Sequence, residues 1–199
     1  MVGTKNVLIT EECGGKDISI ANYTHLRAYH ACRLLDIETY KKEGIVPLVE
    51  QSAIEYAIKT LSDERLTEDR VRKKAEEIWI GYGSNIHRVW LALEQSELLE
   101  EAGHYLIYGS EFLNAVAGHL LCRNKLKEIG RPTIIVCDVP LNKISDTWTN
   151  GLEQAIKDEE TSSCSIAVDC VAPEDIVDFI YPTGYVVDPI LGCTKYRLG

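Results

Sequence analysis

Most motifs that identify an enzyme class from a single sequence are missing from this chain. It has no Walker loop, no His-Glu-x-x-His and no Gly-x-Ser-x-Gly. Gly81-Tyr82-Gly83 lacks the third glycine of a dinucleotide fingerprint and does not follow a clear strand. The five histidines do not cluster with cysteines at metal-ligand spacing, so we expect no metal site. These absences exclude P-loop, Rossmann, zincin and α/β-hydrolase chemistry.

Positive charge is also scarce, and no hydrophobic run is long. The net charge is −10, and no basic stripe is visible, so we expect no strong non-specific binding to nucleic acid. No run approaches the roughly 18 apolar residues of a membrane-spanning helix, so we expect no membrane partner. The first residues, MVGTKNVLIT, have neither the apolar stretch nor the cleavage site of a secretory signal. Together these features predict a soluble cytoplasmic protein.

The cysteines show no pairing pattern. Seven is an odd number, and none of them forms a Cys-x-x-Cys pair. In a chain without a secretory signal such cysteines are expected to be reduced, and most are expected to be small buried residues. They are Cys13, Cys32, Cys122, Cys137, Cys164, Cys170 and Cys193.

The pattern of apolar residues predicts one α+β domain over residues 1–199. Strands are expected at 6–10, 25–32, 104–108, 133–140 and 163–171, with helices at 37–43, 48–61, 67–80, 84–103, 110–130 and 145–159. Asp36 can cap the first helix and Gly44 can end it. Because the helices from about 48 to 103 form a block, we expect a split central sheet with a helical insertion rather than a doubly wound fold.

Three short stretches carry a resemblance to a known superfamily. The first is LRAYHACRLLDIETYKKEGI, in which a strand ending in Tyr29-His30 leads into a helix that finishes at Gly-Ile. It resembles the Tyr-His-Gly-Thr strand end of the ADP-ribosyltransferase superfamily, although Ala31 and Cys32 stand where that pattern has Gly and Thr. The resemblance implies that Tyr29 and His30 bind NAD. A half-buried histidine bonded within the sheet is the alternative.

The second stretch is HYLIYGSEFLNAVAGHL. In the same superfamily a later strand carries an aromatic residue that stacks on nicotinamide, followed by small residues and a helix. If 104–108 is a strand, Tyr105 and Tyr108 point to opposite faces, and Tyr108 at its end is the preferred candidate. The resemblance implies that Ser110 contacts ribose, although capping of the next helix is a sufficient explanation. Glu111, in the first turn of that helix, is a further candidate carboxylate.

The third stretch is SIAVDCVAPEDIVDFIYP. Superfamily members often place a catalytic Glu on a late strand before a Val-x-Pro-like edge, and Asp169 has the comparable place here, with Glu174 five residues later. A carboxylate suits this chemistry because cleavage of NAD develops positive charge on the ribose. The resemblance therefore implies an ADP-ribosyltransferase or NAD glycohydrolase with NAD as substrate and His30, Tyr108 and Asp169 as catalytic residues. Such compact members are often toxins or defence effectors that modify a protein or nucleic-acid target.

Two other interpretations remain open from the sequence. One is an unrelated cysteine enzyme, with Cys32, Cys137 or Cys170 as nucleophile and His30 or His104 as base. The other is a non-catalytic or antitoxin-like binding module with a degenerate site. The helical stretch 48–103 has no place in the resemblance and is a candidate lid, oligomer surface or site for a protein partner.

Overall fold

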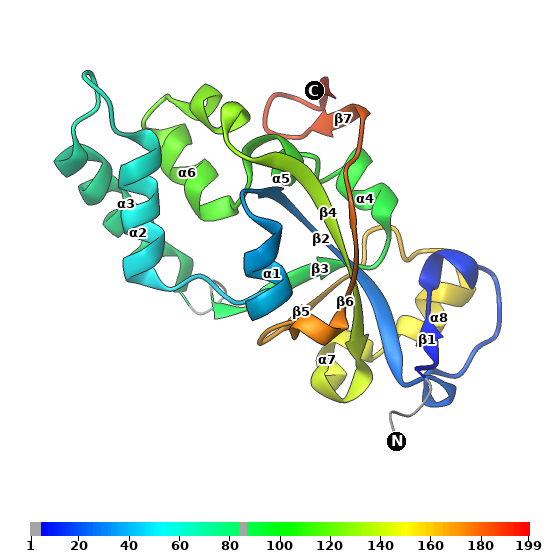
Figure 1. Cartoon of the computed structure of the whole chain (residues 1–199). Helices are drawn as coiled ribbons and strands as arrows, with labels where there is room; N and C mark the ends of the chain where they lie inside the picture. Colours follow the sequence, from blue (N-terminus) through cyan, green and yellow to red (C-terminus); the bar gives the residue numbers. More distant parts are fainter. Residues whose placement is uncertain (1–4, 84–86) are drawn as a thin grey trace.

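The computed structural model describes residues 5–83 and 87–199 as a mixed α+β fold built on one mostly antiparallel sheet. The strand order is β5-β3-β2-β4-β6. These strands span Ser165–Val168, Val89–Ala92, His25–Leu34, Arg131–Pro140 and Ile176–Ile180. The short strand β1 (Val7–Leu8) runs parallel to the start of β2. The first part of the predicted fold, α+β with a central sheet, is confirmed (Figure 1).

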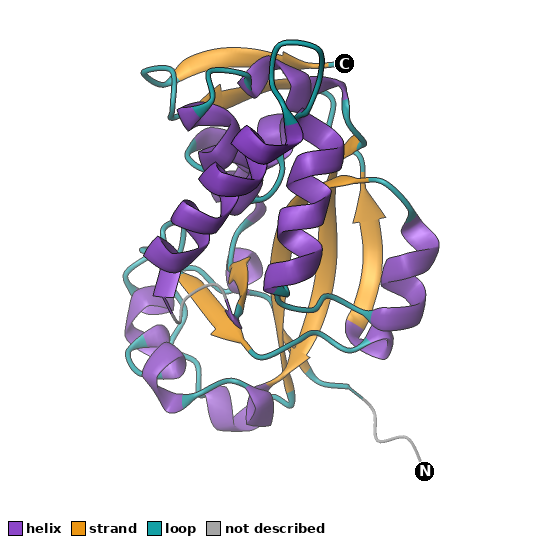
Figure 2. Cartoon of the chain, turned by 90° about the vertical axis from the view of Figure 1, so that its left-hand side faces the viewer, coloured by secondary structure: helices purple, strands orange, loops and turns teal. Residues whose placement is uncertain are grey.

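Helices and a hairpin cover the sheet. The cluster on one face combines residues of β2 and β4 with α2 (Glu50–Leu61), α3 (Glu68–Tyr82), α5 (His104–Tyr108) and α6 (Glu111–His119). The hairpin of β7 (Gly184–Asp188) and β8 (Thr194–Leu198) contributes Val186 and Leu198 to the same cluster. Figure 2 shows several of these helices in front of the long strands. This face therefore holds the larger share of the helical mass.

The second cluster lies on the other face. It includes partly buried residues of α1 (Ile37–Glu43) and α7 (Asp146–Thr149), and buried residues of α8 (Leu152–Lys157). The helix α4 (Gln95–Glu100) follows β3 directly and packs against β7. Among the described residues, no helix has both the length and the apolar character needed to cross a membrane.

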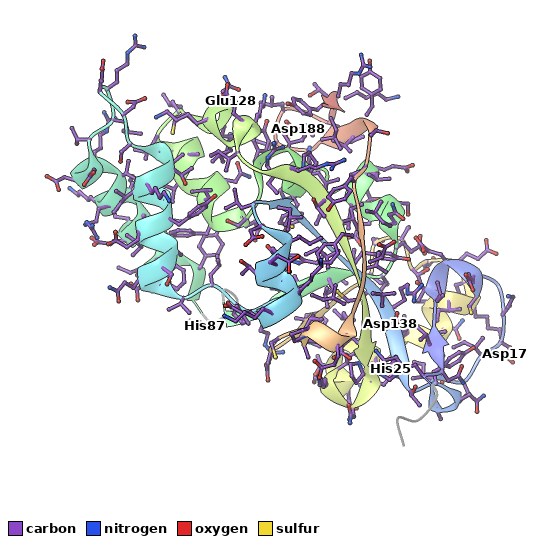
Figure 3. All side chains as sticks on the ribbon, viewed as in Figure 1. Asp17, His25, His87, Glu128, Asp138 and Asp188 are labelled. Atoms are coloured by element: carbon purple, nitrogen blue, oxygen red, sulfur yellow. The ribbon has the colours of Figure 1, made fainter. Side chains whose placement is uncertain are left out.

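The long strands β2 and β4 form the centre of the sheet because they pair along their whole length. Ten consecutive residues from His25 to Leu34 face partners in β4. One of these pairs, Arg27 and Asp138, is also a two-point ion pair, with Arg27 Nε 2.8 Å and Nη2 3.1 Å from the carboxylate oxygens. Asp138 is labelled in Figure 3. The side chain of Asp138 is 7% exposed, so this pair links β2 and β4 from a nearly buried position.

Several local predictions are confirmed by the fold. Asp36 caps α1 by accepting a hydrogen bond from the Glu38 amide, and Gly44 ends the helix with a φ of 76°. Ser110 caps α6 by accepting from the Leu113 amide. The predicted strands at 25–32 and 133–140 correspond to β2 and β4.

Two predictions of local structure are wrong, and one hairpin was not predicted. Residues 104–108 form the helix α5, because Gly103 and Gly109 bound the segment and Leu106, Ile107 and Tyr108 are all buried. A five-residue segment with three consecutive buried side chains has no alternating pattern that separates a helix from a strand. The predicted helix at 84–103 contains the strand β3 and the shorter helix α4, so 48–103 is not wholly helical. The tail, for which no element was predicted, forms the β7–β8 hairpin. Ser84, the expected start of the predicted helix 84–103 and its cap, lies outside the described residues.

Candidate functional site

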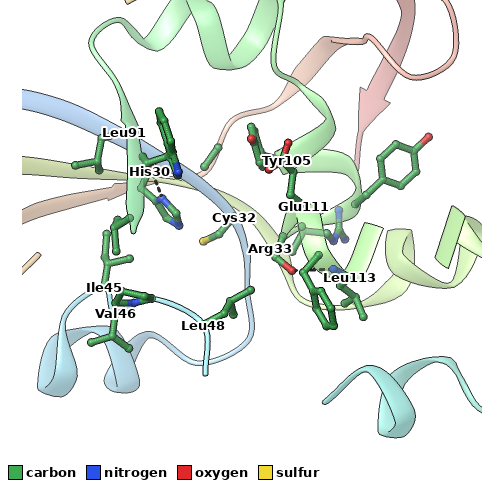
Figure 4. Close-up of a pocket in the computed structure, with 18 of the residues that line it drawn as sticks. His30, Cys32, Arg33, Ile45, Val46, Leu48, Leu91, Tyr105, Glu111 and Leu113 are labelled. Atoms are coloured by element: carbon green, nitrogen blue, oxygen red, sulfur yellow. Dashed lines mark hydrogen bonds between the residues drawn. The ribbon is translucent and has the colours of Figure 1, made fainter. Parts of the chain in front are cut away.

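The candidate site is a cavity of about 950 Å³ that opens where β2 and β3 separate. These strands share one paired position, Tyr29 with Ala92, whereas β2 continues for five more residues. Beyond that pair, the β3 side of β2 becomes the floor of the cavity. Figure 4 shows Ile45, Val46 and Leu48 on one side of this space and Tyr105, Glu111 and Leu113 on the other. A volume of this size lies at the upper end of ordinary ligand sites.

His30 lies on the cavity floor at the point of strand separation. Its Nδ1 is 3.1 Å from the backbone oxygen of Trp90 on β3, so Nδ1 carries the proton and donates it to that carbonyl. Burial lowers the pKa of the imidazole below its ordinary value, so the ring is neutral at neutral pH. A neutral ring that donates from Nδ1 leaves Nε2 as an acceptor. His30 can therefore accept a hydrogen bond from a ligand hydroxyl.

Two aromatic side chains that border the cavity are suited to hold a flat ligand. Trp90 of β3 is 40% exposed, and Tyr105 of α5 is half-buried. Burial, with the nearby Glu111 carboxylate, raises the pKa of the Tyr105 phenol, so the ring stays neutral. Aromatic rings of this kind bind planar or cationic groups through their faces.

Tyr108 borders the cavity but has a different set of partners from the one expected. It is 2% exposed, and its hydroxyl donates to Asp188 Oδ2 at 2.6 Å, beneath the β7–β8 hairpin. Lys127 Nζ lies 5.6 Å from the centre of its ring. Because α5 is a helix, Tyr105 and Tyr108 are not on opposite faces of a strand, and the argument that preferred Tyr108 was wrong.

The predicted carboxylates divide into one that lines the cavity and two that do not. Glu111, at the first position of α6, is part of the lining. Asp169 is exposed, follows the end of β5, and is not among the lining residues; the same is true of Glu174, in the turn before β6. The structure thus brings Glu111, and not Asp169, into the same cavity as His30.

Glu97 of α4 is a lining carboxylate that the sequence did not single out. Burial, together with Glu101 and Glu94, raises the pKa of Glu97 to about 7. The sequence signal was weak, because acidic residues near a helix start are usually solvated.

The other predicted binding residues have local partners. Tyr29 is buried, and its hydroxyl donates to Glu11 Oε2 at 2.6 Å. Ser110 is exposed at the cavity border, and its hydroxyl accepts from the Leu113 amide at 3.3 Å. The capping bond of Ser110 is long and leaves the hydroxyl hydrogen available, so contact with a ligand is compatible with capping.

Arg33 ties the cavity floor to one wall. This guanidinium, on β2 three residues after His30, donates to five backbone carbonyl groups, two in or near the end of α5 and three around residues 127–130. The acceptors are Leu106, Ile107, Lys127, Ile129 and Gly130. These bonds hold the helix that carries Tyr105 against the strand that carries His30.

Two of the three candidate nucleophiles, Cys32 and Cys137, are buried thiols. Burial raises the pKa of the Cys32 thiol to about 11 and that of Cys137 to about 12, so both are protonated at neutral pH. Cys170 is exposed, and no hydrogen bond joins it to His30 or His104 within the described part of the chain. Nor does any group of three or more His, Cys, Asp or Glu suited to a metal ion occur among residues 5–83 and 87–199.

Comparison with known proteins identifies no relative of this chain. No family model, no curated protein and no solved structure matches this chain.

Proposed function

We propose that the chain cleaves the nicotinamide–ribose bond of NAD, as an ADP-ribosyltransferase or an NAD glycohydrolase. The observation that supports this most is the meeting of His30 with aromatic and acidic side chains around one cavity where β2 and β3 separate. A dinucleotide needs a cavity near the upper end of the usual range, and about 950 Å³ meets that need.

In this proposal each group has one role. His30 Nε2 accepts a hydrogen bond from a ribose hydroxyl, because Nδ1 is held by the Trp90 carbonyl. Tyr105 or Trp90 stacks on the nicotinamide ring. Glu111 stabilises the positive charge that develops on the ribose carbon as nicotinamide leaves with the bonding electron pair. Glu111 is the first residue of α6, and its side chain borders the same cavity as His30.

The proposal replaces Asp169 with Glu111 as the catalytic carboxylate, and Tyr108 with Tyr105 as the aromatic residue. The acceptor is water in a glycohydrolase and a macromolecular side chain or base in a transferase. The exposed apolar residues Leu35, Val46 and Leu48 border the cavity on the side of α1 and the start of α2, where an acceptor would approach.

The deciding experiment measures NAD binding by calorimetry and nicotinamide release by chromatography. For Glu111→Gln we expect unchanged folding, nearly unchanged NAD affinity, and release lowered by about two or more orders of magnitude, as for loss of other electrostatic stabilisers. Asp169→Asn is the matched control and should release nicotinamide at the wild-type rate. For His30→Ala, loss of one hydrogen bond should weaken NAD binding by about 1–2 kcal/mol.

Three outcomes would count against these assignments. A folded wild-type protein that gives no heat with millimolar NAD would remove the function. Binding without nicotinamide release would reduce the protein to a binding module. A loss of activity in Asp169→Asn but not in Glu111→Gln would keep the function and reject Glu111.

A further inference from the structure

Positive charge gathers at one end of this acidic molecule, where Figure 3 labels Glu128 and Asp188. Residues 123–131 (RNKLKEIGR) carry four cationic side chains and one carboxylate, and the strand β8 carries Lys195 and Arg197 with no carboxylate. The whole chain has 21 lysines and arginines against 31 aspartates and glutamates. The two segments lie far apart in the sequence, so neither forms a basic stripe by itself, and the fold brings them together.

A cleft of about 310 Å³ lies between these two segments. Lys127 and Arg131 line it from the first segment, and Tyr196 and Arg197 line it from the second. No aspartate or glutamate side chain of the described residues is part of the lining. Only Arg33 also lines the cavity proposed for NAD, so the cleft is a separate site.

The cations of the cleft are held by aromatic rings rather than by carboxylates. Lys127 Nζ lies 4.9 Å from the centre of the Tyr196 ring, and the guanidinium carbon of Arg131 lies 3.7 Å from that of Tyr181. In the part of the chain that the structure describes, no ion pair joins Lys127, Arg131 or Arg197 to a carboxylate. The rings position two of these cations without neutralising their charge.

Such an arrangement favours an anion in the cleft. Like charges around one cleft repel each other, and an anion between them relieves that repulsion. Phosphate is the anion best suited to lysine and arginine together, because its several oxygens accept charge-assisted hydrogen bonds from both. A volume of about 310 Å³ lies at the lower end of ordinary ligand sites, so it suits a small ligand rather than a dinucleotide.

We propose that this cleft binds the phosphate group of a small phosphorylated ligand, with Lys127 and Arg197 as its direct partners. Arg131, held over Tyr181, adds attraction from the edge of the cleft. The proposal does not rest on the cleavage of NAD, because the two sites have only Arg33 in common. Because Lys127 and Arg197 come from different segments, a bound phosphate ties the β7–β8 hairpin to the start of β4 and should raise the Tm of the protein.

The test titrates the whole chain with inorganic pyrophosphate at low salt and follows the backbone amide signals by NMR. We expect shifts at residues 127–132 and 196–199, and an affinity that falls as salt is added. Arg197 is exposed, so Arg197→Gln should fold normally and bind about tenfold more weakly, as for loss of one charge-assisted contact. Lys59→Gln removes the same charge from an exposed position on α2 and should bind like the wild type.

A second pair of probes distinguishes a free phosphate from one attached to an organic molecule. Ribose 5-phosphate should shift the same amide signals, and ribose without phosphate should shift none of them. Tighter binding of ribose 5-phosphate than of pyrophosphate would assign the site to an organic phosphate, and the reverse order would assign it to a free one. Both orders support a phosphate site.

Three results would overturn this proposal. One is the absence of shifts at these residues with millimolar pyrophosphate. Another is equal weakening by Arg197→Gln and Lys59→Gln, because binding would then follow net charge alone. The third is a set of shifts around His30 instead, which would place the phosphate in the other cavity. Pyrophosphate binding by a protein that does not cleave NAD would reject the proposed function and leave this proposal intact.

Discussion

Replacing Gly44 by alanine should destabilise the fold far more than the same change at another helix end. Gly44 ends α1 with φ 76° and ψ −156°, a conformation that is essentially restricted to glycine. A Cβ atom placed there would lie 2.0 Å from the carbonyl oxygen of Val171. That carbonyl accepts from the Ile45 amide at 2.9 Å, and the Val171 amide donates to Ile45 at the same distance. The segment around Ile45, which forms part of the cavity wall, would therefore have to move.

The stability lost by Gly44→Ala is the sum of two contributions. The backbone conformation costs an alanine about 1–2 kcal/mol, and loss of the two hydrogen bonds adds about 2 kcal/mol. We expect Gly44→Ala to lower the free energy of unfolding by about 3–4 kcal/mol, which corresponds to a drop in Tm of about 10 °C for a chain of this size.

Gly109→Ala is the matched control. Gly109 also ends a helix, with φ 81° and ψ −144°, but its nearest neighbour would be Arg33 Cβ at an ordinary 3.8 Å. Gly109→Ala should therefore lose only the cost of the backbone conformation, about 1–2 kcal/mol of the free energy of unfolding. Urea unfolding of both variants followed by circular dichroism measures the difference. If Gly44→Ala is no less stable than Gly109→Ala, the Ile45–Val171 contact does not hold the cavity wall.

Two further predictions separate structural from functional residues. Tyr108→Phe removes the hydroxyl that donates to the buried Asp188 carboxylate. This change should lower the free energy of urea unfolding by about 1–3 kcal/mol, while nicotinamide release stays near the wild-type rate. If release is lost and stability is not, Tyr108 belongs to the site after all. Iodoacetamide at pH 7.5 should label the exposed Cys170 well before Cys32, whose pKa is raised to about 11 by burial, as followed by mass spectrometry of the digested protein; preferential labelling of Cys32 would instead revive the cysteine-enzyme interpretation.

The sequence was most informative where local chemistry decides structure. The Asp36 cap, the Gly44 end and the Ser110 cap each depend on one residue and its immediate neighbours, and each prediction is confirmed. The long strand β4 was visible because it is rich in β-branched residues, and β2 was visible because its side chains alternate between two faces.

What the sequence could not supply depends on contacts between distant segments. Val89–Ala92 is too short for its period to distinguish strand from helix, yet it lies within the sheet, between β5 and β2. Because this strand was predicted to be part of a helix, Trp90 was not recognised as a candidate aromatic residue. Reading 104–108 as a strand led to the preference for Tyr108 over Tyr105, and that argument fails because the facing rule for strands does not apply to a helix.

The Arg33 side chain has a consequence for how the cavity meets a ligand. A single planar guanidinium, with every nitrogen hydrogen-bonded to a carbonyl, sets the separation between the strand that carries His30 and the helix that carries Tyr105. A lysine has one nitrogen and could not serve acceptors in so many directions. The distance between this strand and this helix is thus fixed by Arg33 before a ligand binds. Binding therefore does not carry the free-energy cost of ordering these two walls.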